Sequence, residues 1–260
     1  MDYIFISEYA DKLIKNFIFS LNKKIIEIKR TSHVYAEISD HPDIYMCILD
    51  KDIIVAKEQI PQIANDLGFY SDKTTSKSHV SYDNHDYLNY INEVISPLVM
   101  HAGSKNLGYK YPGSCIFNCV SLGNYFLHNV AYTDPQILDI VQKHENKIVN
   151  VMQGYTNCNV VYIDEKSIIT SDEGIAKALK ASAPEIDFIL VSSGNVVLKG
   201  FPHGFLGGSC GRIDDYIVFN GNLEAHPDFE LIKNFIESKN LKLKYFKEYP
   251  LTDIGSIIGI

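Results

Sequence analysis

The stretch GSCIFNCVSLGNYFLHN, residues 113–129, reads as a β-hairpin that small and polar residues open. A short strand runs to a tight turn at Gly123-Asn124, and a second strand, YFLH, returns from it. Three further stretches share this pattern: HPDIYMCILDKDIIVAKE at 41–58, TNCNVVYIDEKSIITSDE at 156–173 and GGSCGRIDDYIVFNGN at 207–222. Because internal self-similarity is typical of repeat architectures, the sequence predicts several copies of one hairpin-containing unit.

The segments that follow the hairpins repeat as well. Helix-start signals, a capping residue or a proline in the first turn, occur at Thr133-Asp134-Pro135, Ser171-Asp172 and His226-Pro227. Further strands are predicted at Lys147–Val151, Asp187–Val191 and Leu241–Phe246. Each unit therefore reads as two strands, a helix and a third strand.

The two chain ends read as one further unit. Residues 3–6, 8–21 and 24–28 suggest a strand, a helix and a strand, and the closing stretch GSIIGI supplies the missing first strand. Pairing it with the N-terminal unit would close a ring and remove exposed sheet edges. We expect residues 1–260 to form a single domain, in which the less regular range 69–112 is a connecting insertion or, alternatively, a lid over one mouth of the ring.

The composition of the chain limits the classes of partner that it is expected to bind. The formal net charge of -8 gives no electrostatic reason to bind nucleic acid or an anionic membrane. No stretch approaches the roughly 18–20 apolar residues of a membrane span, and the acidic N-terminus is unlike a signal peptide, so we expect a cytoplasmic protein. The five cysteines contain no CxxC pair, which favours free thiols over a disulfide framework or a zinc knuckle. We expect no metal or other cofactor, and the oligomeric state is left open.

These units resemble the pentein, or guanidine-modifying-enzyme, fold of arginine and agmatine deiminases, dimethylarginine hydrolases and amidinotransferases. The resemblance covers nearly the whole chain as five units, one of them split across the termini. A closer resemblance, to an uncharacterised bacterial family with this fold, is carried by HPD (41–43), YPGSCIFN (111–118), QGYTNC (153–158), ITSDEGIAKAL (169–179), GFLGGSCG (204–211) and LTDIGSI (251–257). The implied fold is α/β: a pentein five-bladed propeller of ββαβ units, closed by pairing the C-terminal strand with the N-terminal unit.

Equivalent strand ends converge on the centre of such a ring, so the hairpin-opening residues should meet there. The resemblance implies that a thiolate attacks a guanidinium carbon while a histidine handles protons and carboxylates hold the cation. The candidate catalytic residues are Cys158, Cys210, His41 and Asp43, and the candidate substrate contacts are Asp253, Tyr155, His203, Arg212 and Cys115. The implied function is a cysteine-dependent hydrolase or transferase that acts on a small guanidine or amidine compound in the central channel.

Two departures from the pentein pattern keep an alternative open. Pentein enzymes carry their cysteine on the closing strand, where this chain has Asp253–Ser256, and a histidine near the place of Thr156, so the standard triad is not intact. The alternative is a non-catalytic binding or interaction protein, as translation initiation factor 6 is on the same fold. In that case Cys158 is a buried apolar residue, the glycines beside Cys210 form only a tight bend, and His203 is an exposed loop residue.

Overall fold

The strands of the chain form five separate three-stranded sheets. The structure is a computed structural model, which describes residues 1–69 and 82–260. The sheets have the strand orders β15-β1-β2, β3-β4-β5, β6-β7-β8, β9-β10-β11 and β12-β13-β14. In every sheet the first pair of strands is antiparallel and the second pair is parallel. This is the pattern of a hairpin followed by a helical crossover, as the repeated stretches predict.

The strand and helix bounds follow the repeat. The strands are β1 (Tyr3–Ser7), β2 (Lys24–Ile28), β3 (Met46–Leu49), β4 (Asp52–Val55), β5 (Val99–Ala102), β6 (Val120–Leu122), β7 (Tyr125–His128), β8 (Lys147–Asn150), β9 (Val160–Asp164), β10 (Ser167–Thr170), β11 (Asp187–Leu190), β12 (Cys210–Ile213), β13 (Tyr216–Phe219), β14 (Lys242–Lys244) and β15 (Ile258–Gly259). The helices are α1 (Lys12–Ser20), α2 (Pro42–Tyr45), α3 (Ile60–Asp66), α4 (Asn84–Val94), α5 (Pro135–Lys143), α6 (Glu173–Ser182) and α7 (Phe229–Ser238). Short 3₁₀ turns lie at Ala36–Ile38, Lys57–Gln59, Gly113–Cys115, Gly207–Ser209 and Leu223–Ala225.

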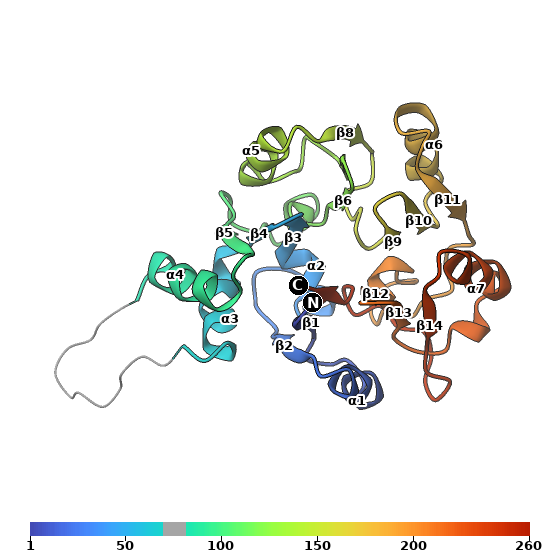
Figure 1. Cartoon of the computed structure of the whole chain (residues 1–260), viewed down its shortest axis with the longest axis horizontal. Helices are drawn as coiled ribbons and strands as arrows, with labels where there is room; N and C mark the ends of the chain where they lie inside the picture. Colours follow the sequence, from blue (N-terminus) through green and yellow to red (C-terminus); the bar gives the residue numbers. More distant parts are fainter. Residues whose placement is uncertain (70–81) are drawn as a thin grey trace.

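The sheets surround a common centre. Their first strands lie toward this centre, and the long helices lie outside (Figure 1). β15 runs antiparallel to β1, with Ile4 opposite Gly259 and Phe5 opposite Ile258. The predicted pairing of the C-terminal strand with the N-terminal unit is therefore confirmed, and both chain ends lie near the middle of the molecule (Figure 1).

Local capping signals place several helices. The side chains of Asp134 and Asp172 cap α5 and α6 by accepting hydrogen bonds from backbone N–H groups of the first turn, as predicted. Helix α7 begins at Phe229, shortly after the predicted His226-Pro227 start. The range 69–112 contains α4 and β5, which supply a helix and the third strand of the second sheet, while residues 70–81 lie outside the described residues.

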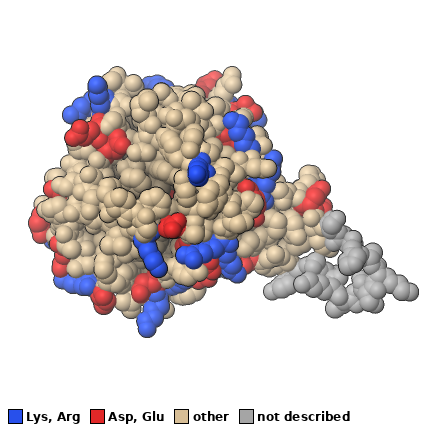
Figure 2. Space-filling view, turned by 180° about the vertical axis from the view of Figure 1, so that it is seen from behind, with Lys and Arg blue, Asp and Glu red and all other residues tan. Residues whose placement is uncertain are grey.

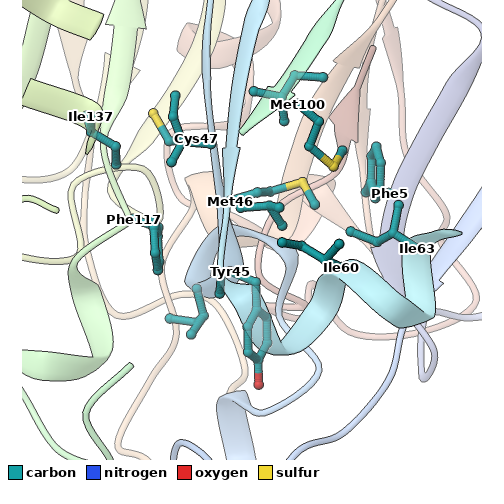
Figure 3. Packing of buried hydrophobic residues seen from close by; sticks show 14 of the residues in the cluster. Phe5, Tyr45, Met46, Cys47, Ile60, Ile63, Met100, Phe117 and Ile137 are labelled. Carbon is teal, nitrogen blue, oxygen red and sulfur yellow. The ribbon is translucent and has the colours of Figure 1, made fainter. Parts of the chain in front are cut away.

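Apolar side chains from neighbouring units fill the space between sheets and helices. Figure 3 shows part of the cluster around β3, with Ile60 and Ile63 of α3 on one side and Phe117 on the other. These side chains are fully buried. On the molecular face of Figure 2, charged side chains of both signs are intermingled and lie mostly around the periphery.

Candidate functional site

Polar side chains from four of the five units meet in the interior of the ring. We call this group the central cluster; its members are His41, Asp43, Asn118, Cys158, Asp253 and Ser256. None of them is more than 4% exposed. They come from hairpin-opening segments and from the segment before β15, as the convergence of strand ends predicts.

Asp43 and Cys158 are in direct contact in this cluster. The Cys158 thiol donates to Asp43 Oδ2 over 3.0 Å, and the Ser256 hydroxyl donates to the same oxygen over 2.7 Å. Asn118 holds both partners, because its amide nitrogen lies 3.2 Å from Cys158 Sγ and 3.0 Å from the Asp43 carbonyl oxygen. Asp43 Oδ1 is buried and has no hydrogen-bond partner among the described residues.

Asp253 is the second buried carboxylate of the cluster. It accepts hydrogen bonds from the backbone N–H of Phe205 (2.9 Å) and of Gly255 (3.0 Å), and its Oδ1 lies 3.7 Å from His41 Nδ1. Burial raises the pKa of Asp253, and the nearby charge of Asp43 adds to this effect, whereas His41 and the two N–H groups oppose it. Among the described residues, His41 is the only basic side chain within 4.0 Å of either carboxylate.

Two glycines allow these side chains to come so close. A Cβ atom at Gly208 would lie 2.2 Å from Asp253 Oδ1. At Gly255, where φ is +72°, a Cβ would lie 2.0 Å from the Cβ of His41. The glycines beside Cys210 and before Ser256 thus make room for the cluster itself.

The surroundings of Cys158 favour its thiol form over its thiolate form. Burial raises its pKa well above the ordinary value, and the charges of Asp43 and Asp253 raise it further. Among the described residues, the hydrogen-bond partners of the Cys158 thiol are Asp43 and Asn118, and no histidine is one of them. A cation placed against the two carboxylates would remove part of this penalty.

A cavity of about 230 Å³ lies beside the cluster, between the fourth and fifth sheets. Its wall includes Asn159, the neighbour of Cys158, and the segment Gly204–Leu206. The Phe205 N–H of this segment donates to Asp253 Oδ2 over 2.9 Å, so the segment lies between the cavity and this carboxylate. His203 lies on the cavity wall and is exposed, and its Nδ1 contacts the Gly204 carbonyl oxygen over 3.0 Å.

The remaining candidate residues lie around the cluster or away from it. Cys210 is buried in an apolar core near Asp253, and burial raises the pKa of its thiol. The Tyr155 hydroxyl pairs with Ser114 over 2.7 Å. Burial raises the pKa of Cys115 to about 12, and its thiol donates to a backbone carbonyl.

Arg212 does not join the central cluster. Its guanidinium donates to the carbonyl oxygens of Asp214 (2.9 Å) and Ile163 (2.6 Å). It lines a separate surface groove together with Asp164 and Lys166. Arg212 lies two residues beyond Cys210 on β12, farther from the opening of the strand, and reaches Ile163 of the neighbouring strand β9.

Asn118 and Ser256 are members of the cluster that the sequence did not single out as catalytic or binding residues, although the stretch Asp253–Ser256 was expected to lie at the centre of the ring. Both lie in the quoted motifs, YPGSCIFN and LTDIGSI, at the openings of inner strands. Their polar character at these positions was the available signal, because buried polar side chains need partners.

One group of side chains in residues 1–69 and 82–260 has the composition and spacing of possible metal ligands. Asp83, His85 and Asp86 lie within 4.8 Å of one another and are exposed. Asp83 and Asp86 form a capping box at the start of α4, which accounts for their position.

No helix in residues 1–69 and 82–260 has both the length and the apolar character to cross a membrane.

Solved structures of low sequence identity share this architecture. An amidinotransferase from Microseira wollei, of the saxitoxin biosynthetic pathway, superimposes with a TM-score of 0.53 and 9% identity over 95% of this chain and 88% of that chain. A DDAH from Pseudomonas aeruginosa in complex with citrulline gives 0.51 and 9% over 95% and 92%. A dimethylarginine dimethylaminohydrolase adduct with 4-chloro-2-hydroxymethylpyridine gives 0.50 and 10% over 95% and 92%. These likenesses establish the pentein fold, as the repeat predicted.

By sequence, the chain is similar to fewer known proteins than by structure. No curated protein matches the chain. A family model matches residues 5–102 and 83–258, and the chain therefore belongs to the family described as a family of unknown function (DUF6873).

Proposed function

We propose that this chain binds a small guanidine or amidine cation at the central cluster, with Asp43 and Asp253 as its carboxylate partners. The observation that carries the proposal is Asp43 Oδ1, a fully buried carboxylate oxygen without a hydrogen-bond partner among the described residues. Within those residues, His41 is the only basic side chain within 4.0 Å of either carboxylate. A buried charge of this kind is stabilised by a partner that brings both positive charge and N–H donors.

A guanidinium or amidinium group meets both requirements. Its planar N–H groups can donate two parallel hydrogen bonds to one carboxylate, and its charge is delocalised and weakly hydrated. Among proteins of this fold, the solved structures include an amidinotransferase and a DDAH in complex with citrulline. These names support the ligand class, although the likeness itself concerns the fold.

A second candidate function is a hydrolase or transferase that uses Cys158 as nucleophile. The 3.0 Å contact between Cys158 Sγ and Asp43 Oδ2 favours it, because the carboxylate can accept the thiol proton. The thiolate would attack the amidine carbon and form an S–C bond. The C–N electron pair would leave with the amine, which takes up a proton, and His41 is the nearby proton donor. Water or a second amine would then displace the sulfur.

Binding and turnover can be tested separately. Isothermal titration with methylguanidine and acetamidine should show binding that Asp43→Asn and Asp253→Asn each weaken about tenfold or more, because a charge-assisted hydrogen bond contributes about 1.5–3 kcal/mol. Asp215→Asn is the matched control, since Asp215 is an exposed carboxylate paired with Lys242. Unchanged affinity in both cluster variants would refute the binding site.

Cys158→Ala separates the two candidate functions. If the thiol is the nucleophile, this variant should retain cation binding and lose release of ammonia or amine from a guanidine panel. Full turnover by Cys158→Ala would exclude the thiol mechanism and leave the binding proposal intact. Absence of turnover in the unmodified chain, together with binding, would favour the non-catalytic function.

A further inference from the structure

We infer that Cys47 and Cys119 are an oxidisable pair, and that they form a disulfide between the second and third units when the chain folds in the presence of a small disulfide such as oxidised glutathione. The inference does not depend on the proposed function, because neither cysteine belongs to the central cluster. It assigns a covalent modification to two thiols that have no role in cation binding.

The two thiols are in direct contact across the boundary between two units. Cys47 lies on β3, the first strand of the second sheet, and Cys119 directly precedes β6, the first strand of the third sheet. The Cys119 thiol donates to Cys47 Sγ over 2.7 Å. The S–S bond of a disulfide is about 2.05 Å long, so the two sulfurs need to approach by only about 0.7 Å.

The surrounding structure holds the two sulfurs in this position. Both side chains are at most 4% exposed and belong to the apolar cluster around β3. In Figure 3, Cys47 lies on the side of β3 that faces Phe117 and Ile137. The Phe117 carbonyl oxygen accepts the Cys119 N–H over 2.8 Å and lies 3.4 Å from Cys119 Sγ. Folding therefore gives the two thiols a high effective concentration with respect to each other.

The contact is specific to this pair. The chain has five cysteines, which could pair in several ways. Among the described residues, the thiols of Cys115, Cys158 and Cys210 donate to oxygen atoms, and none of these three lies within hydrogen-bond distance of another sulfur. The fold therefore favours one disulfide over a mixture of pairings.

Formation of the bond consists of two thiol–disulfide exchanges. One cysteine, as thiolate, attacks a sulfur of oxidised glutathione, so that the S–S bond breaks, a mixed disulfide forms and one glutathione thiolate leaves. The second cysteine, as thiolate, attacks the protein sulfur of the mixed disulfide, forms the Cys47–Cys119 bond and releases the second glutathione thiolate. Two protein thiols are oxidised, one small disulfide is reduced, and the two protons pass to the released thiolates.

The bond should form during folding rather than in the folded chain. Burial raises the pKa of the Cys119 thiol well above its ordinary value, and the contact with Cys47 raises it further, so little thiolate is present after folding. The buried position also excludes an oxidant of the size of glutathione. In the unfolded chain both thiols are accessible, and packing of the two units then brings them together.

The disulfide would close a long loop. The two cysteines are 72 residues apart in the chain, and cross-links over longer loops remove more conformational entropy from the unfolded state. The bond would also join the segments that carry Asp43 and Asn118, because Asn118 precedes Cys119 and the helix that contains Asp43 leads into β3. The oxidised chain should therefore unfold at a higher urea concentration than the reduced chain.

The test refolds the full chain from urea in glutathione buffers with an increasing oxidised fraction. Free thiols are then blocked with iodoacetamide under denaturing conditions, and disulfide-linked peptides are mapped by mass spectrometry. We expect one linked pair of peptides, which contain Cys47 and Cys119, and alkylation of the other three of the five cysteines. The urea midpoint of this species should exceed that of the same chain after reduction with dithiothreitol.

Cys119→Ala should abolish the linked pair and the increase in urea midpoint that oxidation causes. Cys115→Ala is the matched control, because Cys115 is also a buried thiol of the same segment but donates to a backbone carbonyl oxygen, so the linked pair should persist. Circular dichroism shows whether each variant is folded, and the peptide map of the unmodified chain decides the inference even if a variant fails to fold.

Three results would overturn the inference. The first is the absence of a linked pair at every glutathione ratio. The second is a linked pair that contains any other cysteine, or one that Cys115→Ala abolishes as well. The third is a cross-linked chain whose urea midpoint equals or lies below that of the reduced chain, because the bond would then not fit the folded structure.

Discussion

Substitution of Asp253 by Asn tests whether the central cluster holds an uncompensated buried charge. The pKa of Asp253 is raised in the folded chain, chiefly by burial, so the folded chain binds a proton more readily than the unfolded chain does. Stability should therefore fall as the pH rises above about 3.9, the ordinary pKa of Asp, and level off above the folded pKa. Asp253→Asn removes this loss, because an amide does not titrate.

Two effects of opposite sign set the magnitude. Asp253 accepts one backbone N–H at each oxygen, from Phe205 and from Gly255. Asn has one acceptor oxygen, so one buried N–H loses its partner at a cost of about 1–3 kcal/mol that does not depend on pH. Against this, the substitution removes the destabilisation that the buried carboxylate causes at high pH. This destabilisation is about 1.4 kcal/mol for each pH unit by which the folded pKa lies above the unfolded pKa. Relief of the repulsion with Asp43 acts in the same direction.

The assay is urea unfolding at several pH values between about 4 and 8, with far-UV circular dichroism as the signal. The chain has 17 Tyr and no Trp, so tyrosine emission provides a second probe. The free energy of unfolding of Asp253→Asn minus that of the unmodified chain should increase with pH. Taking this difference cancels the titration of groups that the substitution does not touch.

Asp215→Asn is the control for this pH series. The hydrogen bond with Lys242 lowers the pKa of the exposed Asp215, so its carboxylate is ionised in both states above about pH 5. The free energy of unfolding of Asp215→Asn minus that of the unmodified chain should not change with pH over that range. A flat or falling difference for Asp253→Asn would refute the reasoning, because it would mean that Asp253 is already well compensated in the folded chain.

Three further predictions concern the same region. Gly208→Ala should lower the melting temperature through a loss of about 1–3 kcal/mol, because the new methyl group would lie 2.2 Å from Asp253 Oδ1; an unchanged melting temperature would show that the cluster can move apart. Burial lowers the pKa of His128 to about 4, so its share of the stability, about 3 kcal/mol, should be present above about pH 6.5 and lost as the pH falls toward 4. His128→Gln should flatten that dependence in urea titrations, and an equally steep profile would contradict the assignment. Because the pKa of the Cys158 thiol is raised by burial, iodoacetamide at neutral pH should label it far more slowly in the folded chain than in urea, as peptide mass spectrometry can measure; rapid labelling of the folded chain would contradict a buried neutral thiol.

Local sequence decided the repeated unit of this protein. Tight turns depend on neighbouring residues, and two of the predicted turn positions, Asp50 and Asp214, adopt positive φ angles as hairpin turns require. Helix capping by Asp134 and Asp172 is equally local. The pairing of the two chain ends could also be predicted, since the N-terminal unit lacked one strand and the C-terminal strand had no unit of its own.

Only the tertiary packing decided which of the hairpin-opening residues contact one another. Cys158 contacts Asp43, far away in the chain, and Asn118 and Ser256 complete the contact from two other units. The direction and depth of each strand set these distances, and a one-residue shift turns a side chain to the opposite face. For this reason the sequence could place cysteines, carboxylates and a histidine near one centre, but only the packed structure shows a thiol on a carboxylate and a second carboxylate beside the histidine.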